Sequence, residues 1–195
     1  MLLPALQLLL NQLNAAIPQI DGVEPVVMGN IAMLDGQDGG GANENLSRMV
    51  MSLVNLEEES TLKNGTHHRM EQGRLVHRNR PVFLNAYLLF SSNFPDYPTS
   101  IRLLGEVVEF FQSKKVFTFH NTQHHSGLPT DDPEVRAIRL ILELFTLTFE
   151  QINHLWGSLG GKQVPFAMYK VRLVEMDAKR TTAEGSPITE IYLNE

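Results

Sequence analysis

The sequence predicts a single α+β domain: a mixed central β-sheet flanked by three main helices, with long loops and an extended C-terminal tail. Three segments lead to this prediction. Residues 81–90 are apolar on both alternating faces, as in a central strand covered on both sides. Residues 99–114 have the spacing of an amphipathic helix, and residues 165–176 alternate like a strand with one face in water.

Composition limits the class of protein. A hydrophobic content of 43% and a charged fraction of 19% are ordinary for a globular domain of 195 residues. The net charge of −6, with basic residues scattered and the densest run (67–80) broken by Glu71, argues against a general nucleic-acid binder. The absence of cysteine excludes disulfides, zinc-finger sites and thiol catalysis.

The apolar N-terminal segment is not expected to be a targeting signal. Residues 1–10 have no basic flank and no small-residue cleavage site, and the apolar run stops near Leu10, too short to span a membrane. We therefore expect a chain made in the cytoplasm. The glycosylation-like triplets at 45–47 and 64–66 are interpreted as chance matches.

The first half of the chain predicts one helix and two strands. Leucines at helical spacing predict a helix over 2–17, which Pro18 ends. Residues 26–34 predict a strand in which Gly29 marks a bulge or a close approach, and residues 46–58 predict a second strand. Polar segments without a period predict a flexible loop at 35–45 and a long loop or excursion at 59–80.

The central strand and the helix after it have definable faces. One side of the strand carries Val82, Leu84, Ala86, Leu88 and Phe90, and the other Phe83, Tyr87 and Leu89. The core side of the helix is expected to hold Ile101, Leu104, Val107, Val108 and Phe111. Lys114 and Lys115 stand at its negative end, and a loop is expected at 121–133.

A strand predicted over 136–149 leads into a helix with two start signals. Thr148 and Gln151 have capping-box spacing, and Leu147 and Ile152 stand at hydrophobic-staple positions. The helix runs through the apolar residues Phe149, Ile152, Leu155, Trp156 and Leu159. In the strand at 165–176, the expected inward residues are Ala167, Tyr169, Val171 and Leu173, and the outward ones Lys170 and Arg172.

The C-terminal tail alternates as a strand. Residues 1–177 are expected to form the domain and residues 178–195 an extension. Ile188, Glu190 and Tyr192 alternate in the tail, so it is a candidate for strand addition to another sheet. The alternative is that the tail folds back on its own sheet.

Three glycines and a lysine between Gly157 and Lys162 suggest a phosphate loop at first sight. In that motif the first glycine precedes the lysine by six residues and a hydroxyl residue follows it, whereas here the separation is five and Gln163 follows. The order of elements is also reversed, because a phosphate loop opens a helix and these glycines close one. We interpret them as a helix C-cap and expect no nucleotide cofactor.

No residue set predicts catalysis or metal binding. The histidines (His67, His68, His120, His124 and His125) fall in expected loops and lack the helix face or nearby carboxylate that a metal site needs. The acidic run at 56–60 is interpreted as a solvated turn. Because no nucleophile with its base and orienting group is recognisable, we expect no catalytic, cofactor or metal residues and no enzyme.

Five ordered blocks between residues 25 and 177 resemble a bacterial family. They are GNIAMLD (29–35), SLVNLEEESTLKN (52–64), PVFLNAYLLFSSNFPDY (81–97), LGEVVEFFQSKKVFTFHNT (104–122) and LELFTLTFEQINHLWGSLGGKQVPFAMYKVRLVEMD (142–177). The family is the cap, or tail-terminator, family of phage-tail-like extracellular contractile injection systems.

The resemblance implies a structural, non-enzymatic role. Such caps form a six-fold ring that stacks on the last layer of the inner tube, ends its polymerisation and anchors the distal end of the contractile sheath. The implied partners are other copies in a homohexamer, the inner tube protein and the sheath protein, with neither nucleic acid nor membrane. Assembly in the cytoplasm would be followed by residence in the particle, which can be released from the cell.

Candidate contact residues lie at two places. Trp156 and Lys162 mark the glycine corner, although a tryptophan on an apolar helix face also suits the core. The tail supplies Ile188, Ile191, Tyr192 and Leu193. Two other functions stay open: a transient assembly chaperone or length regulator, and a ligand-binding α/β domain with an unrecognised site.

Overall fold

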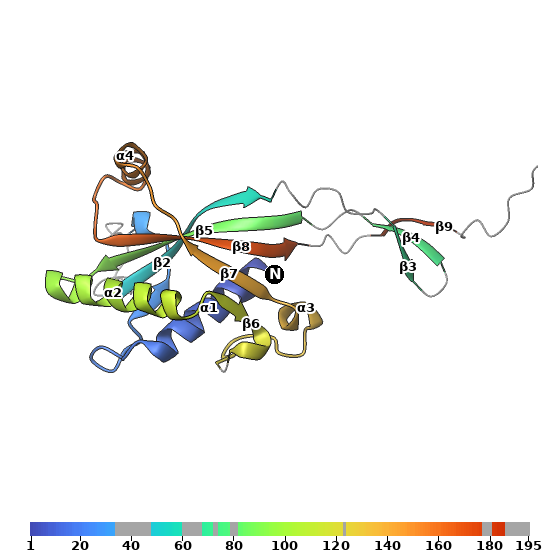
Figure 1. The fold of residues 1–195 in the computed structure, drawn as a ribbon, viewed down its shortest axis with the longest axis horizontal. Helices are drawn as coiled ribbons and strands as arrows, with labels where there is room; N and C mark the ends of the chain where they lie inside the picture. Colours follow the sequence, from blue (N-terminus) through green and yellow to red (C-terminus); the bar gives the residue numbers. More distant parts are fainter. Residues whose placement is uncertain are drawn as a thin grey trace, which may run out of the picture.

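A computed structural model describes most of the chain (Figure 1). The described residues are 1–33, 48–59, 68–71, 74–78, 82–122, 124–176 and 181–185, with the backbone alone described at 68–71, 74–78, 173–176 and 181–185. The helices are α1 (Leu2–Ala16), η1 (Ile31–Met33), α2 (Tyr97–Ser113), η3 (Phe119–Asn121), α3 (Pro133–Arg136) and α4 (Phe149–Ser158). The strands are β1 (Val26–Met28), β2 (Arg48–Glu58), β3 (His68–Glu71), β4 (Arg74–Arg78), β5 (Val82–Asn93), β6 (Val116–Thr118), β7 (Arg139–Leu144), β8 (Phe166–Met176) and β9 (Thr181–Gly185).

The main sheet is mixed, as predicted. Its six strands run in the order β1-β2-β5-β8-β7-β6, with β1 parallel to β2 and the other neighbours antiparallel. Residues 82–90 of the predicted apolar segment lie within β5, between the long strands β2 and β8. The two-sided hydrophobic pattern thus correctly identified an interior strand.

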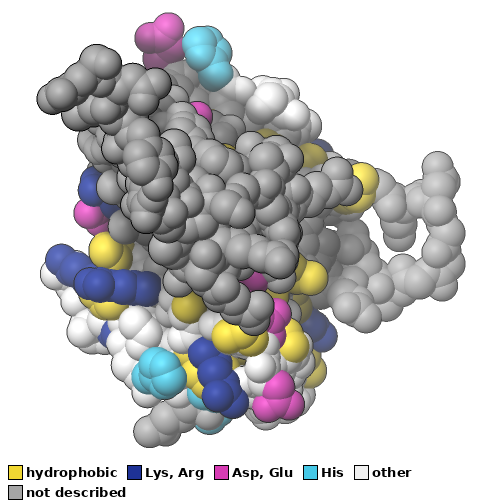
Figure 2. Space-filling view, turned by 90° about the vertical axis from the view of Figure 1, so that its right-hand side faces the viewer, with side chains coloured by type: hydrophobic (Ala, Val, Ile, Leu, Met, Phe, Trp, Pro, Cys, Tyr) yellow, Lys and Arg dark blue, Asp and Glu magenta, His cyan; other side chains and the backbone are white. Residues whose placement is uncertain are grey.

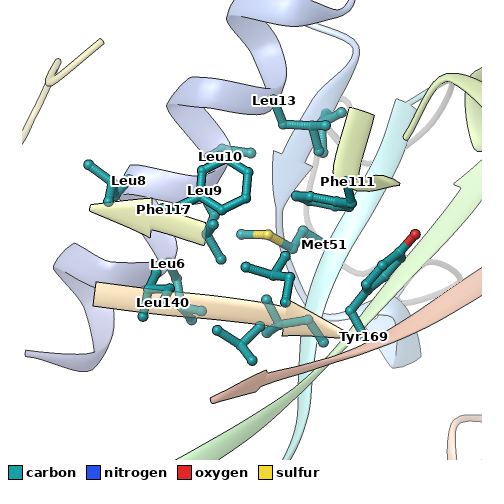
Figure 3. Close-up of a cluster of buried hydrophobic side chains, with 14 of the residues drawn as sticks. Leu6, Leu8, Leu9, Leu10, Leu13, Met51, Phe111, Phe117, Leu140 and Tyr169 are labelled. Carbon is teal, nitrogen blue, oxygen red and sulfur yellow. The ribbon is translucent and has the colours of Figure 1, made fainter. Parts of the chain in front are cut away.

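Helices α1 and α2 cover one face of this sheet. Buried side chains from both helices and from the strands converge there into the larger core cluster (Figure 3). Leu9 and Leu13 of α1, Phe111 of α2 and Phe90 of β5 are all almost fully buried. This face holds the larger of the two core clusters.

Helix α4 covers the opposite face at one end of the sheet (Figure 1). Trp156 packs there with Ile31, Val50, Leu89 and Met168 in a second cluster. The three main helices expected from the sequence are therefore α1, α2 and α4. Tyr169 and Val171 of β8 face the larger core as predicted, whereas the opposite side of β8 is polar only beyond Met168, at Lys170 and Arg172.

The buried stripe of α2 differs from the predicted one. Ser100, Leu103, Val107 and Phe111 are buried, while Ile101 is 46% exposed. The Ser100 hydroxyl accepts a hydrogen bond from the Phe94 amide (3.3 Å), so a small polar residue occupies an inward position at the start of the helix. A hydrophobic pattern cannot reveal that Ser100, and not Ile101, lies on the buried face of α2.

Two predicted strands are shorter than expected. The segment 26–34 forms β1 and then η1, and Gly29 makes the expected close approach to β2: its amide donates to Met51 O (3.2 Å) and its carbonyl accepts from Ser52 Oγ (2.8 Å). The segment 136–149 begins inside α3, which Asp132 caps and Pro133 opens, so that β7 is only six residues long.

The segment 59–80, expected to be a long loop or excursion, contains two strands that the sequence reasoning did not predict. Strands β3 and β4 pair with each other, and β4 also pairs with β9, which comes from more than 100 residues further along the chain. The strand order of this small sheet, β3-β4-β9, corresponds to the order β2-β5-β8 in the main sheet. Each of its strands is the chain neighbour of the corresponding main-sheet strand: β3 follows β2, β4 precedes β5 and β9 follows β8. We call this small sheet the arm; it lies beyond the ends of β5 and β8 (Figure 1). The expected loop at 35–45 and the tail at 186–195 lie outside the described residues, and the domain boundary at 177 stays a prediction.

Candidate interaction surfaces

The glycine corner is a helix end, as its sequence predicted. Helix α4 starts with a complete capping box, in which the Gln151 amide donates to Thr148 Oγ1 (3.2 Å) and the Thr148 amide to Gln151 Oε1 (2.9 Å). At the other end, Gly160 and Gly161 have positive φ values of 103° and 81°, and the Gly161 amide donates to Trp156 O (2.7 Å). This bond and the left-handed glycines define a Schellman-type C-cap, which presents helix carbonyls rather than a cradle of amides for phosphate.

Phe149, the first residue of α4, is the functional candidate that the sequence reasoning missed. Its side chain is 92% exposed, although it belongs to the apolar residues of the helix. The flanking staple residues Leu147 and Ile152 pack against the second core cluster. Phe149 follows the N-cap Thr148 as the first helical residue, and its side chain does not join Leu147 and Ile152 in packing against the second core cluster. The position of Phe149 directly after the N-cap was the sequence signal that could have revealed its exposure. An aromatic side chain left so exposed is typical of a contact with another molecule.

Beside α4 the second core cluster opens into a groove of about 380 Å³. We call it the outer groove, and its lining residues are Val54, Asn55, Glu57, Tyr87, Phe145, Leu147, Gln151, Leu155 and Met168. Most of the lining is apolar, and the sequence positions of Leu147 and Gln151 flank Phe149. Together they form a largely hydrophobic surface on one side of the sheet.

A polar network borders the outer groove. The Tyr87 hydroxyl donates to Glu57 Oε2 (2.5 Å), and Lys170 Nζ lies 3.4 Å from the same oxygen. The hydrogen bond from Tyr87 and then the charge of Lys170 lower the pKa of Glu57, and the same hydrogen bond raises the pKa of Tyr87. Each group stays in its ordinary charge state near neutral pH, so the network ties β2, β5 and β8 together without supplying a base or a nucleophile.

A second concavity lies at the other end of β2 and β5. We call it the end hollow; it encloses about 480 Å³ and is lined by Ile20, Asp21, Val23, Glu24, Pro25, Arg48, Phe94, Pro95, Asp96 and Thr99. Asp96 uses its carboxylate to cap α2 through the Thr99 amide (3.1 Å), and Glu24 accepts from Asn14 Nδ2 (3.1 Å). The lining residues include three carboxylates, one guanidinium and five apolar side chains.

The predicted contact residues fall into two groups. The Trp156 side chain is only 4% exposed and stacks edge-on against Phe166 (centroids 5.4 Å apart), whereas Lys162 is exposed just beyond the glycine corner. Trp156 and Lys162 are close in sequence, but Trp156 lies in the core and Lys162 lies at the surface. The tail residues Ile188, Ile191, Tyr192 and Leu193 lie outside the described residues, so the tail contact stays a prediction.

His125 of the 119–125 segment contributes to the local fold. His125 stacks on Phe119 (4.1 Å between centroids), and its Nε2 lies 2.9 Å from Phe119 O. Within the described residues, no group of three or more His, Asp or Glu side chains is arranged to hold a metal ion. No described helix has the length and apolar character needed to cross a membrane. Viewed from the arm side, the described side chains mix hydrophobic residues with charges of both signs (Figure 2).

These features describe a small α+β domain with several exposed surfaces suited to contacts with other proteins. The chain belongs to the Pvc16 N-terminal domain family, whose model matches residues 5–190. This agrees with the cap and terminator family expected from the sequence.

Two solved structures share the fold. One is the cryo-EM structure of the PVC sheath/tube terminator of an extracellular contractile injection system in the extended state, with a TM-score of 0.61, 15% identity and coverage of 100% of this chain and 63% of that chain. The other is the anti-feeding prophage cap (AFP tube terminating cap), with a TM-score of 0.50, 13% identity and coverage of 76% and 49%. The present chain thus spans 63% of the PVC terminator chain. A search among curated proteins finds no significant match.

Proposed function

We propose that this protein is a structural cap of a contractile injection system: a ring that ends the inner tube and anchors the distal end of the sheath. The observation that carries the proposal is the family match over residues 5–190, joined to a fold shared with two tube terminators. The role is structural rather than catalytic. Its partners are further copies of the chain, the inner tube protein and the sheath protein.

The surfaces suit such a role because they differ from one another. A ring of identical subunits needs two unlike surfaces on each copy, so that each contact is heterologous and the rotation closes. The outer groove with Phe149 and the end hollow lie at separate places on the main sheet, and the arm is a separate three-stranded sheet. We expect six copies in the ring, with one face matching the last tube layer and the other unable to accept a further layer.

The contacts predicted from the sequence are part of the proposed cap function. Lys162 and the side chains around the buried Trp156 would meet a neighbouring subunit at the glycine corner. The tail residues Ile188, Ile191, Tyr192 and Leu193 would add as a strand to a sheath or cap subunit. The protein would assemble in the cytoplasm and then remain in the particle.

Native mass spectrometry and electron microscopy test the proposal. We expect a six-copy species of the purified chain, and a ring at the end of purified particles that is lost, with irregular tube lengths, when the protein is withheld. A chain that stays a single copy and is absent from finished particles, yet still alters tube length, would instead identify a transient chaperone or length regulator.

A further inference from the structure

The two outermost strands of the main sheet, β1 and β6, each have one side that faces away from the sheet. On that side an outermost strand presents backbone N–H and C=O groups to which a strand of another molecule can add. Both strands are only three residues long, and such short edge strands already limit this kind of pairing. Asparagine side chains occupy outward-facing backbone groups at both edges.

Asn14 of α1 covers the outward side of β1. The Pro25 carbonyl accepts a hydrogen bond from the Met49 amide of β2 (2.9 Å), so by alternation the backbone groups of Val26 face away from β2. The Asn14 side chain binds both of them: its Oδ1 accepts from the Val26 amide (3.0 Å), and its Nδ2 donates to the Val26 carbonyl (2.9 Å). One carboxamide thus takes the place of a neighbouring strand.

Asn121 of η3 does the same at the opposite edge. The Lys115 carbonyl accepts a hydrogen bond from β7 (2.9 Å), so by alternation Val116 and Thr118 of β6 face outward. The Oδ1 of Asn121 accepts from the Thr118 amide (2.9 Å), and its Nδ2 donates to the Val116 carbonyl (3.0 Å). The Thr118 carbonyl in turn accepts from Thr122 Oγ1 (2.9 Å). Three outward backbone groups of β6 are therefore occupied by side chains.

A third asparagine lies where β2 extends past β1. Within the described residues, β1 pairs with β2 only as far as Met51, and a bulge follows between Leu53 and Asn55. Beyond the bulge the Glu59 amide donates to β5 (2.8 Å), so by alternation the backbone of Leu56 faces away from β5. The Leu56 amide donates to Asn55 Oδ1 (2.9 Å), so this outward donor is occupied as well.

The chemistry of the asparagine side chain suits this use. A carboxamide carries one carbonyl acceptor and an amide donor, as a peptide group does, so it can satisfy an edge strand without continuing the sheet. Asn11 shows how an asparagine that supports a loop differs: its Nδ2 donates to Ser126 O (2.7 Å), which belongs to no strand. Asn14, Asn55 and Asn121 instead bind the strand groups that an added strand would need.

We propose that Asn14 and Asn121, together with Asn55, close the edges of the main sheet to strand addition by other protein chains. Partners then contact this sheet through side chains, at surfaces such as the outer groove with Phe149, and do not extend it. The strand predicted in the tail would find its acceptor outside the main sheet of another copy. The inference goes beyond the proposed function, because it concerns the sheet itself and holds whether or not the protein ends a tube.

Native-state hydrogen exchange, followed by NMR, tests the closure in the isolated chain. Asn14→Ala should speed exchange of the Val26 amide, and Asn121→Ala that of the Thr118 amide, each by about tenfold, because each variant removes the acceptor of that amide. Asn121→Asp keeps an acceptor oxygen and should leave the Thr118 amide protected. Asn11→Ala is the matched control, since it removes a side-chain bond that no strand uses, and it should change neither amide. Unchanged exchange in both edge variants would overturn the proposal.

Sedimentation velocity tests whether an opened edge accepts a strand. Asn121→Ala should form species larger than any that the wild type forms at the same concentration, because β6 of one copy can then pair with β6 of another. Adding Val116→Lys should suppress these species, because like charges on two pairing edges repel each other. Asn11→Ala should sediment as the wild type does.

Three results of this experiment would contradict the proposal. Faster exchange without larger species would mean that the edge does not accept a strand even when it is open. Equal association of Asn11→Ala would mean that general destabilisation is the cause, and species that persist with Val116→Lys would not form through β6. A wild-type chain that forms no ring would contradict the proposed function and leave the closed edges standing.

Discussion

The Tyr87 hydroxyl lies 2.5 Å from the Glu57 carboxylate and donates a hydrogen bond that joins β5 to β2 at the border of the outer groove. Lys170 of β8 approaches the same carboxylate, and its ammonium lies 5.4 Å from the centre of the Tyr87 ring. One carboxylate therefore links three neighbouring strands at the border of the outer groove, beside α4.

Replacing Tyr87 with phenylalanine should raise the pKa of Glu57 toward its ordinary value of about 4.3. A lowered folded-state pKa contributes stability above the ordinary value, and this contribution is lost as pH falls through the folded value. Tyr87→Phe should therefore lose less stability between pH 7 and pH 3 than the wild type. Carboxyl NMR titration and urea unfolding at the two pH values measure both effects. Tyr97→Phe, at an exposed site, is the control, and an unchanged Glu57 titration in Tyr87→Phe would contradict the assignment.

The capping box should contribute measurably to stability. Thr148→Ala removes the acceptor of the Gln151 amide and should lower the free energy of unfolding by about 1 kcal/mol. Thr148→Ser retains the hydroxyl and should lose much less. Urea denaturation checks both, and equal losses in the two variants would mean that the methyl group, not the cap, matters.

Replacing two glycines of the same segment with alanine should change the stability of the protein in opposite directions. Gly157 lies inside α4 with no atom within 4 Å of an added Cβ, so Gly157→Ala should stabilise the protein by about 0.5–1 kcal/mol. Gly161 has a φ of 81°, and Gly161→Ala should destabilise it by about 1 kcal/mol through left-handed strain. Thermal unfolding of the pair measures the difference, and the same sign in both would refute the C-cap interpretation.

Phe149 should matter for assembly and not for folding. Because its side chain is 92% exposed, Phe149→Ser should leave the thermal midpoint of the isolated chain nearly unchanged while weakening ring or particle association. Trp156→Ala, in the second core cluster, should instead cost about 3–5 kcal/mol of folding stability. Calorimetry and native mass spectrometry separate the two effects. Normal assembly of Phe149→Ser would remove this residue from the contact surface.

Deleting residues 186–195 should weaken capping and leave the fold intact. The tail is predicted to add as a strand to another subunit, whereas β9 at 181–185 already pairs with β4 within the chain. Circular dichroism should show an unchanged domain, and electron microscopy should show particles with poorly anchored sheaths. Unchanged tube length and sheath anchoring would eliminate the tail as a contact.

Local signals predicted much of this protein. The capping box at Thr148 and Gln151, the glycine end of α4, helix α1 and the two-sided strand β5 were all predictable, because each depends on residues within a few positions of one another. The same reasoning identified the glycines as a helix C-cap, since the order of helix, glycines and strand is itself a sequence property. It also reached the family through long ordered blocks rather than through a site.

What the tertiary structure decided depends on residues that are distant in sequence. The inward position of Ser100 follows from its bond to Phe94, and the exposure of Phe149 follows from how Leu147 and Ile152 pack on the sheet. The arm exists because β4 pairs with β9 across more than 100 residues. Closing so long a connection costs conformational entropy that only the completed sheet offsets, so no local pattern could reveal the pairing of β4 with β9. The sequence by itself determined most of the elements and the family, and the fold alone decided which surfaces those elements expose.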